Sequence, residues 1–86
     1  MPYIKEEQRR KYNAHINEIL KEFGKQSDNV AGEFTYVVYR LLKHFNGAFW
    51  LRAMGMGCVI CAALEWYRRD SAPYEDEKAE ENGDVK

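Results

Sequence analysis

The alternation of apolar and polar positions predicts three helices. In the first segment, apolar residues recur every three or four positions, which places them along one face of a helix. Glu6 and Glu7 stand near its start and Lys21 near its end, where the helix dipole favours those charges. Gly24 is a suitable stop, so we expect a helix over about residues 5–23. The apolar stripe consists of Tyr12, Ile16, Ile19, Leu20 and Phe23.

A second helix is expected over about residues 30–45. Ser27, Asp28 or Asn29 is placed to cap its start, and Asn46-Gly47 is a turn signal after its end. The β-branched and aromatic residues at 34–39 are also typical of a strand, but the length and the period of the stripe favour a helix. The stripe consists of Val30, Phe34, Val37, Val38, Leu41, Leu42 and Phe45.

The third segment, about residues 48–70, combines small residues with an aromatic and basic ending. Ala53, Gly57 and Cys61 recur every four positions, and each glycine inside a helix costs about 1 kcal/mol relative to alanine. A helix tolerates this cost where another backbone comes close. The neighbour is either another helix of the same chain or a second subunit, or else the glycines break the segment in two. Pro73 is expected to end this helix.

The chain is short for a domain that folds alone. Its 86 residues make one domain, and a core of that size rarely supplies more than about 3–5 kcal/mol. Cys58 and Cys61 are too close in sequence to staple distant segments, and they lie mid-helix among apolar residues, so we interpret them as buried core residues rather than a redox pair. With so few metal ligands, oligomerisation is the expected source of stability. A thiolate zinc site shared by two chains is a minor alternative.

Charge divides the chain into two parts. Residues 1–69 hold 11 Lys and Arg against 7 Asp and Glu, whereas residues 70–86 hold 2 against 7. We therefore expect a three-helix domain over residues 1–71, and an ordered acidic segment over 72–86 that docks on this body or on a neighbouring subunit. A solvated tail and a short helix are the simpler interpretations of the same composition. The balance does not favour nucleic-acid binding.

The expected location is the cytoplasm, with no membrane partner. The N-terminal sequence MPYIKEEQRR has no apolar region of the signal-peptide type. The longest uncharged and mostly apolar run is the twelve residues Ala53–Leu64, whereas a membrane span needs about 20.

Arginines beside aromatic residues are the strongest candidates for function. Arginine binds phosphate or carboxylate through two parallel hydrogen bonds, and aromatic rings stack on planar groups. Ordinary surface arginines that pair with the acidic segment are the simpler interpretation. His15 and His44 lie in no catalytic motif; we expect boundary packing for His15 and weigh a ligand contact for His44. The candidate ligand-binding residues are Arg9, Arg10, Tyr36, Tyr39, Arg40, Tyr67, Arg68, Arg69 and Tyr74.

Motifs at both ends resemble a known family. These are MPYI at residues 1–4, YRR at 67–69 and the ending APYEDEK–ENGDV at 72–85. Together they resemble a family of short proteins of unknown function from phage, prophage and bacterial genomes. The resemblance implies no activity. It does imply that the ending is more than a disposable tail, and that Pro73 and Tyr74 dock against something.

These observations lead to an all-α, helix-packed homo-oligomer that binds a ligand and is not an enzyme. We expect an anionic, nucleotide-like small molecule in aromatic and arginine pockets, with no cofactor, no metal and no catalytic residue. By analogy with other small phage proteins, such a binder would sequester an immune signal of the host and act against its defence. The alternative is a protein-interaction module that blocks or recruits a host protein through its aromatic–basic surface or its acidic segment.

Overall fold

The protein is a set of three helical rods joined by short connections. The computed structural model describes residues 2–23 and 28–85, and no strand occurs among them. This confirms the all-α prediction. In chain order the elements are α1 (Glu6–Phe23), α2 (Val30–Leu42), the 3₁₀ turn η1 (Lys43–Phe45), α3 (Phe49–Trp66), the π-helical segment η2 (Tyr67–Ser71) and α4 (Ala72–Asn82). The helix stop expected at Gly24 and the cap expected at Ser27 lie outside the described residues.

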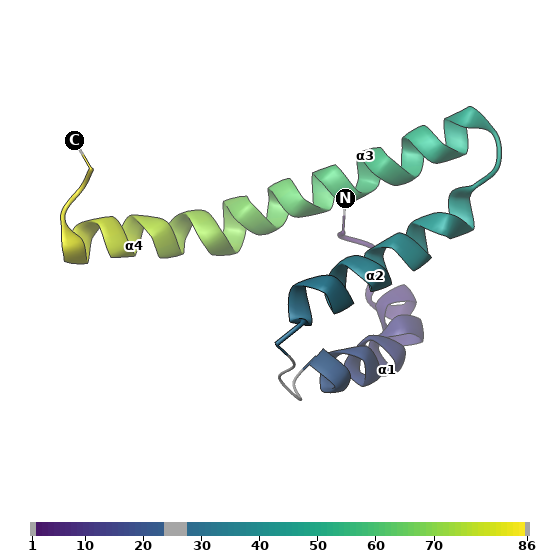
Figure 1. Ribbon diagram of the computed structural model, residues 1–86, viewed down its shortest axis with the longest axis horizontal. Coiled ribbons are helices and arrows are strands. Elements are labelled where there is room, and N and C mark those ends of the chain that lie inside the picture. Colours follow the sequence, from purple (N-terminus) through teal and green to yellow (C-terminus); the bar gives the residue numbers. More distant parts are fainter. Residues whose placement is uncertain (1, 24–27, 86) are drawn as a thin grey trace.

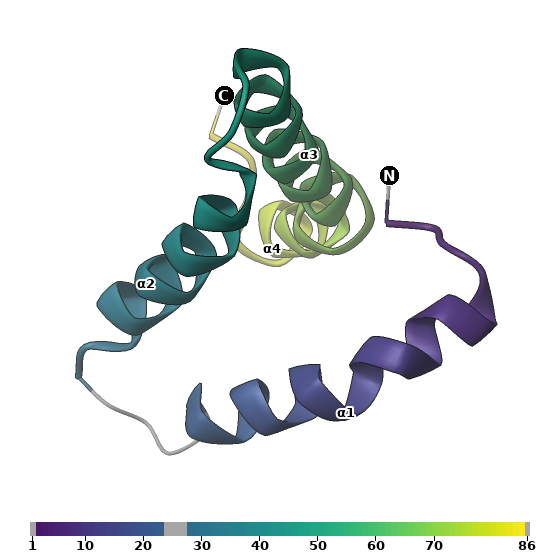
Figure 2. The same ribbon diagram turned by 90° about the vertical axis from the view of Figure 1, so that its right-hand side faces the viewer.

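The helices are arranged openly, with few contacts between them. Helices α2 and α3 run in opposite directions on either side of the turn after η1, and α1 lies across the other end of α2 (Figure 1). When the long α3–α4 rod is viewed nearly end on, α2 and α1 lie to one side of it and below it, and the N-terminal residues run back from α1 toward the rod (Figure 2). Helices α1 and α2 meet where the rings of Phe23 and Phe34 pack edge to face, with centroids 6.2 Å apart.

Close packing of α2 against α3 depends on Gly55. This glycine is the one residue classed as buried in the described part of the chain. A Cβ at Gly55 would lie 3.3 Å from Phe45 Cδ2 and 3.4 Å from Leu42 Cδ2. Arg52 fixes the turn between the helices, since its Nε donates to the Gly47 carbonyl at 3.0 Å. A neighbour within the chain is therefore present at Gly55, as the side chains of Leu42 and Phe45. A Cβ at Gly57, the glycine of the Ala53–Gly57–Cys61 repeat, would have nothing within 4 Å, so a contact there stays a prediction.

The described residues of a single copy do not form a hydrophobic core. No hydrophobic side chain is buried among the described residues, and the radius of gyration is 16.4 Å against about 12 Å expected for a compact chain of this length. The solvent-accessible surface is 7968 Å², whereas a compact 10.1 kDa monomer exposes about 5,300 Å². Cys58 and Cys61 are both exposed and free in this chain, so the prediction that they are buried in its core is wrong.

The third helix does not end at Pro73, contrary to prediction. It continues through Pro73 as one rod, Phe49–Asn82. Pro73 is the second residue of α4, and Ala72 separates it from η2. At this junction the Ala72 N–H donates to the Tyr67 carbonyl, five residues earlier. A proline in an ordinary α-helix clashes with the carbonyl four residues before it and leaves that carbonyl unpaired. The wider π turn has already interrupted the regular α-helical hydrogen bonds at this point, so the helix accommodates the proline.

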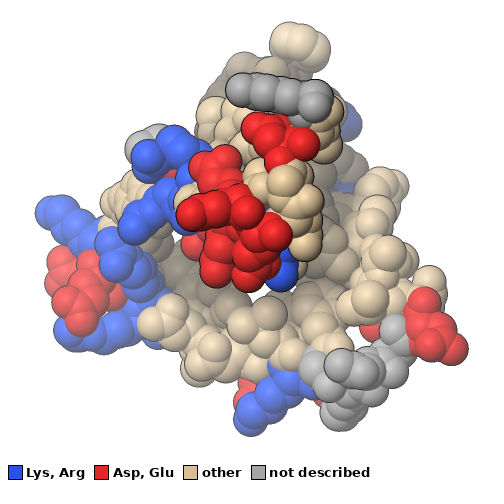
Figure 3. All heavy atoms as spheres, turned by 90° about the vertical axis from the view of Figure 1, so that its left-hand side faces the viewer, with Lys and Arg blue, Asp and Glu red and all other residues tan. Residues whose placement is uncertain are grey.

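Helix α4 carries most of the acidic segment away from the rest of the chain. It extends beyond α1 and α2 at the end of the rod (Figure 1). A view toward that end shows its Asp and Glu side chains gathered together, with Lys and Arg gathered mainly to one side (Figure 3). The segment is thus helical as far as Asn82, and its docking on the body or on a neighbouring subunit stays a prediction.

Candidate functional site

An arginine–tyrosine network joins the N-terminal residues to the end of α3. Arg69 Nη1 donates a hydrogen bond to the Tyr3 hydroxyl at 2.7 Å, and its guanidinium lies 5.7 Å from the centre of the same ring. Arg68 Nε donates to Glu65 Oε1 at 2.6 Å. Hydrogen bonds from Arg68 and from Tyr3 hold the pKa of Glu65 below its ordinary value of 4.5. The network therefore contains two guanidiniums around one ionised carboxylate.

A cavity of about 330 Å³ lies on this network. Tyr3 and Trp66 give it aromatic walls, and the Trp66 side chain is among the exposed large apolar groups at 62%. Arg69 supplies a cation, whereas Glu65 and Asp70 supply carboxylates, so the cavity has no excess of positive charge. An anion in this cavity would be held by the directed hydrogen bonds of the Arg69 guanidinium rather than by net charge. The lining residues are Pro2, Tyr3, Ala62, Glu65, Trp66, Arg69 and Asp70.

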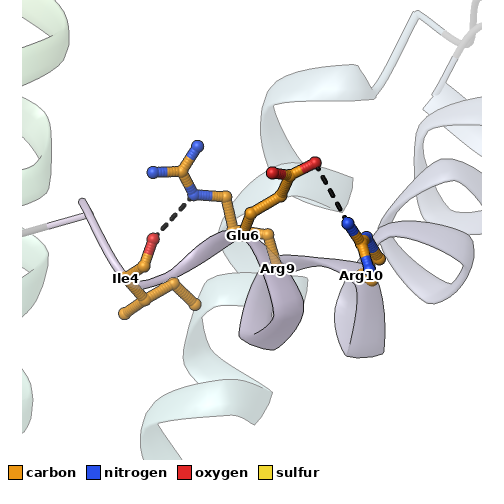
Figure 4. Close-up of polar contacts among 4 residues, drawn as sticks. All are labelled: Ile4, Glu6, Arg9 and Arg10. Carbon is orange, nitrogen blue, oxygen red and sulfur yellow. Dashed lines mark hydrogen bonds and ion pairs between the residues drawn. The ribbon is translucent and has the colours of Figure 1, made fainter.

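The predicted arginines of α1 have different surroundings from each other. Arg9 Nε donates to the Ile4 carbonyl at 2.7 Å (Figure 4). Because Ile4 directly follows Tyr3, this hydrogen bond anchors the N-terminal segment on α1. Arg10 pairs instead with Glu6 at 3.3 Å on the surface of the same helix (Figure 4). Arg9 is thus associated with the segment that forms the cavity, while Arg10 has an exposed intrahelical partner.

The predicted group on α2 forms a separate cluster. Arg40 Nη1 donates to the Tyr36 hydroxyl at 2.8 Å, and Lys43 lies 5.6 Å from the centre of the Tyr39 ring. None of the three predicted residues lines the cavity around Arg69, and Tyr36 instead lines a second cavity between α1 and α2. One chain therefore does not bring Tyr36, Tyr39 and Arg40 to the cavity.

The remaining predicted aromatic residues lie outside the cavity lining. The Tyr67 hydroxyl donates to Glu75, which raises the pKa of Tyr67 above its ordinary value of 10.0. Tyr74 has Lys78 5.6 Å from its ring centre. Tyr67 thus links η2 to α4, whereas the contact between Tyr74 and Lys78 lies within α4.

Sequence reasoning missed several cavity residues. Tyr3 and Glu65 were not predicted, although Tyr3 belongs to the MPYI motif that carries the family resemblance. Trp66 stood beside the predicted Tyr67 in the aromatic–basic cluster without being chosen. His44 packs edge to face on Phe45, with centroids 5.2 Å apart. Among the residues that the structure describes, no group of three or more His, Cys, Asp or Glu is placed to hold a metal.

Comparison with known proteins gives a family and no activity. No curated protein and no solved structure matches this chain. The family model for a domain of unknown function, DUF6899, matches residues 1–85, and the chain therefore belongs to that family.

Proposed function

We propose that this protein is a non-enzymatic, cytoplasmic binding protein that holds an anionic, nucleotide-like molecule and acts as a homo-oligomer. The observation that carries the proposal is the cavity lined by Arg69, Tyr3 and Trp66, in which the Arg69 guanidinium lies over the Tyr3 ring. A volume of about 330 Å³ falls at the small end of the range of ligand pockets, which is about 300–1,000 Å³. Such a cavity suits one base or one phosphorylated sugar rather than a large cofactor.

The parts of the cavity match the parts of a nucleotide. The exposed Trp66 ring offers a flat surface for a base, and base–aromatic stacking contributes about 1–3 kcal/mol. Arg69 keeps donors beyond the one that it gives to Tyr3, so it can also reach a phosphate. Arg68 and Tyr3 both donate hydrogen bonds to the Glu65 carboxylate. Its negative charge is thus compensated and repels a bound anion less. In a phage, the proposed role would be sequestration of a nucleotide immune signal of the host.

The test is isothermal titration of the purified full-length chain with AMP, ATP, cyclic AMP and a cyclic dinucleotide. Arg69→Ala should weaken binding of the best of these probes at least tenfold, because it removes the only guanidinium in the cavity lining. Arg40→Ala is the matched control, since Arg40 also contacts a tyrosine hydroxyl but does not line the cavity. Native mass spectrometry should show the same oligomer for all three proteins. Equal affinity of the Arg69→Ala variant would refute the site.

A second candidate function is supported by α4. This helix projects from the body with its acidic side chains exposed, as expected of a module that binds another protein. In that case none of the four nucleotides binds, and the intact chain retains a host protein in stoichiometric amount. A chain that ends at Ser71 should stay folded and lose this protein. Retention of the protein by the shortened chain would exclude α4 as the binding element.

A further inference from the structure

The face of α3 that points away from α2 carries a regular apolar stripe, which we call the outer seam. Its positions are separated alternately by four and three residues, the spacing by which two helices pack side by side. Phe49 is 83% exposed and Met56 is 63% exposed, and the other members are exposed as well. The outer seam consists of Phe49, Ala53, Met56, Ile60 and Ala63 of α3 and continues to Tyr67, the first residue of η2.

No other part of the described chain covers this face. Helix α2 lies on the opposite side of α3, where Gly55 meets Leu42 and Phe45. Gly57 lies beside the outer seam, and a Cβ built there would have nothing within 4 Å. The seam is therefore an apolar surface without a partner in one copy of the chain.

The exposed area shows how much surface is left for a partner. One chain exposes 7968 Å², which is about 2,700 Å² more than a compact monomer of its mass. A standard protein–protein interface buries about 800 Å² on each partner. The surplus thus exceeds three such interfaces, which is the range of obligate oligomers and accounts for the lack of a core.

A second copy fits the outer seam better than a lipid bilayer does. By length and composition alone, the rod Phe49–Asn82 could cross a membrane. Its uncharged stretch Ala53–Leu64, however, is only about 18 Å long, whereas the hydrocarbon layer is about 30 Å thick. Arg52 precedes this stretch and Glu65 follows it.

Charge decides the direction of the pair. Helix α4 has five acidic side chains and one lysine, all exposed. A parallel pair would place two such helices side by side, where like charges repel. An antiparallel pair places them at opposite ends of the assembly.

We propose that two copies of this chain pair antiparallel along the outer seams of α3, with Met56 of each copy facing Ile60 of the other. This inference rests on the proposed function only in requiring a homo-oligomer, and it names the surface that forms it. In this register Ala53 lies opposite the partner's Ala63, and the small side chains allow the helix axes to come close.

The test combines native mass spectrometry with disulfide cross-linking. The wild-type chain should give a native mass that is an even multiple of 10.1 kDa, and Ile60→Glu should reduce it at least twofold. Val85→Glu is the control, because Val85 is fully exposed beyond the end of α4 and should leave the mass unchanged. Should Ile60→Glu fail to fold, cross-linking decides alone.

For cross-linking, Cys58 and Cys61 are first changed to serine. A chain with Ala53→Cys and Ala63→Cys together should form a disulfide-linked dimer, whereas Ala53→Cys alone should not. The two positions are about 15 Å apart along one helix, so a disulfide between them must join two chains. Dimers from Ala53→Cys alone, no dimers from the double variant, or a wild-type protein that needs detergent would each overturn the proposal. Nucleotide binding by Arg69 variants is measured separately, so failure of the seam and failure of the ligand site are distinguishable.

Discussion

Gly55 and Gly57 test the packing of α2 on α3, because they lie two residues apart in the same helix and differ in surroundings. A Cβ at Gly55 would lie 3.3 Å from Phe45 Cδ2, 3.4 Å from Leu42 Cδ2 and 3.5 Å from Phe45 Cβ. A Cβ at Gly57 would meet nothing within 4 Å. The same substitution at the two positions therefore separates helix propensity from packing.

The expected magnitudes follow from these distances. Alanine in place of glycine stabilises a helix interior by about 1 kcal/mol, so Gly57→Ala should raise the free energy of unfolding by about that amount. At Gly55 the same gain is offset, because Phe45 and Leu42 must move by a few tenths of an ångström. We expect Gly55→Ala to be about neutral. The larger Gly55→Leu should lower the free energy of unfolding by about 1–3 kcal/mol, the usual cost of overpacking.

The assay is urea unfolding followed by circular dichroism, with all variants at one protein concentration because stability of an oligomer depends on concentration. Gly57→Leu serves as the matched control for Gly55→Leu. A Gly55→Leu variant as stable as the wild type would refute the close approach of α2 and α3. A Gly57→Ala variant less stable than the wild type would instead show that a neighbouring copy lies against Gly57.

Two further predictions concern the rod. Because hydrogen bonds from Arg68 and Tyr3 lower the pKa of Glu65, its ion pair should stabilise the fold above pH 4.5 and be lost as the pH falls through the lowered value. Carboxyl NMR titration should show this, and Arg68→Ala should raise the pKa of Glu65; titration of the wild-type group at 4.5 or above would contradict the network. Pro73→Ala should change the free energy of unfolding by less than about 1 kcal/mol, because η2 already relieves the proline clash. If urea unfolding instead showed that Pro73→Ala raises the free energy of unfolding by about 3 kcal/mol, the full cost of proline in a helix, η2 would not relieve the clash.

Most of the candidate site could not be predicted from the sequence. Arg69 was a candidate because it follows Trp66 and Tyr67, and the structure places it in the cavity. Its partner Tyr3 is 66 residues away in sequence, so no local pattern could pair them. Tyr36, Tyr39 and Arg40 are also tyrosines and an arginine, yet none of them lines the cavity, because their place depends on how α2 packs rather than on residue type.

The sequence by itself determined the helices, because their apolar stripes and charged ends are local properties. The first helix was expected over 5–23 and runs over Glu6–Phe23, and the turn at Asn46-Gly47 lies where η1 ends. Family membership is also a property of the sequence alone. Only the tertiary structure decided that the rod continues through Pro73, since a π turn depends on hydrogen bonding that composition does not reveal. It alone also showed that the apolar stripes do not enclose a core in one chain, because burial depends on how the helices are arranged and not on their pattern.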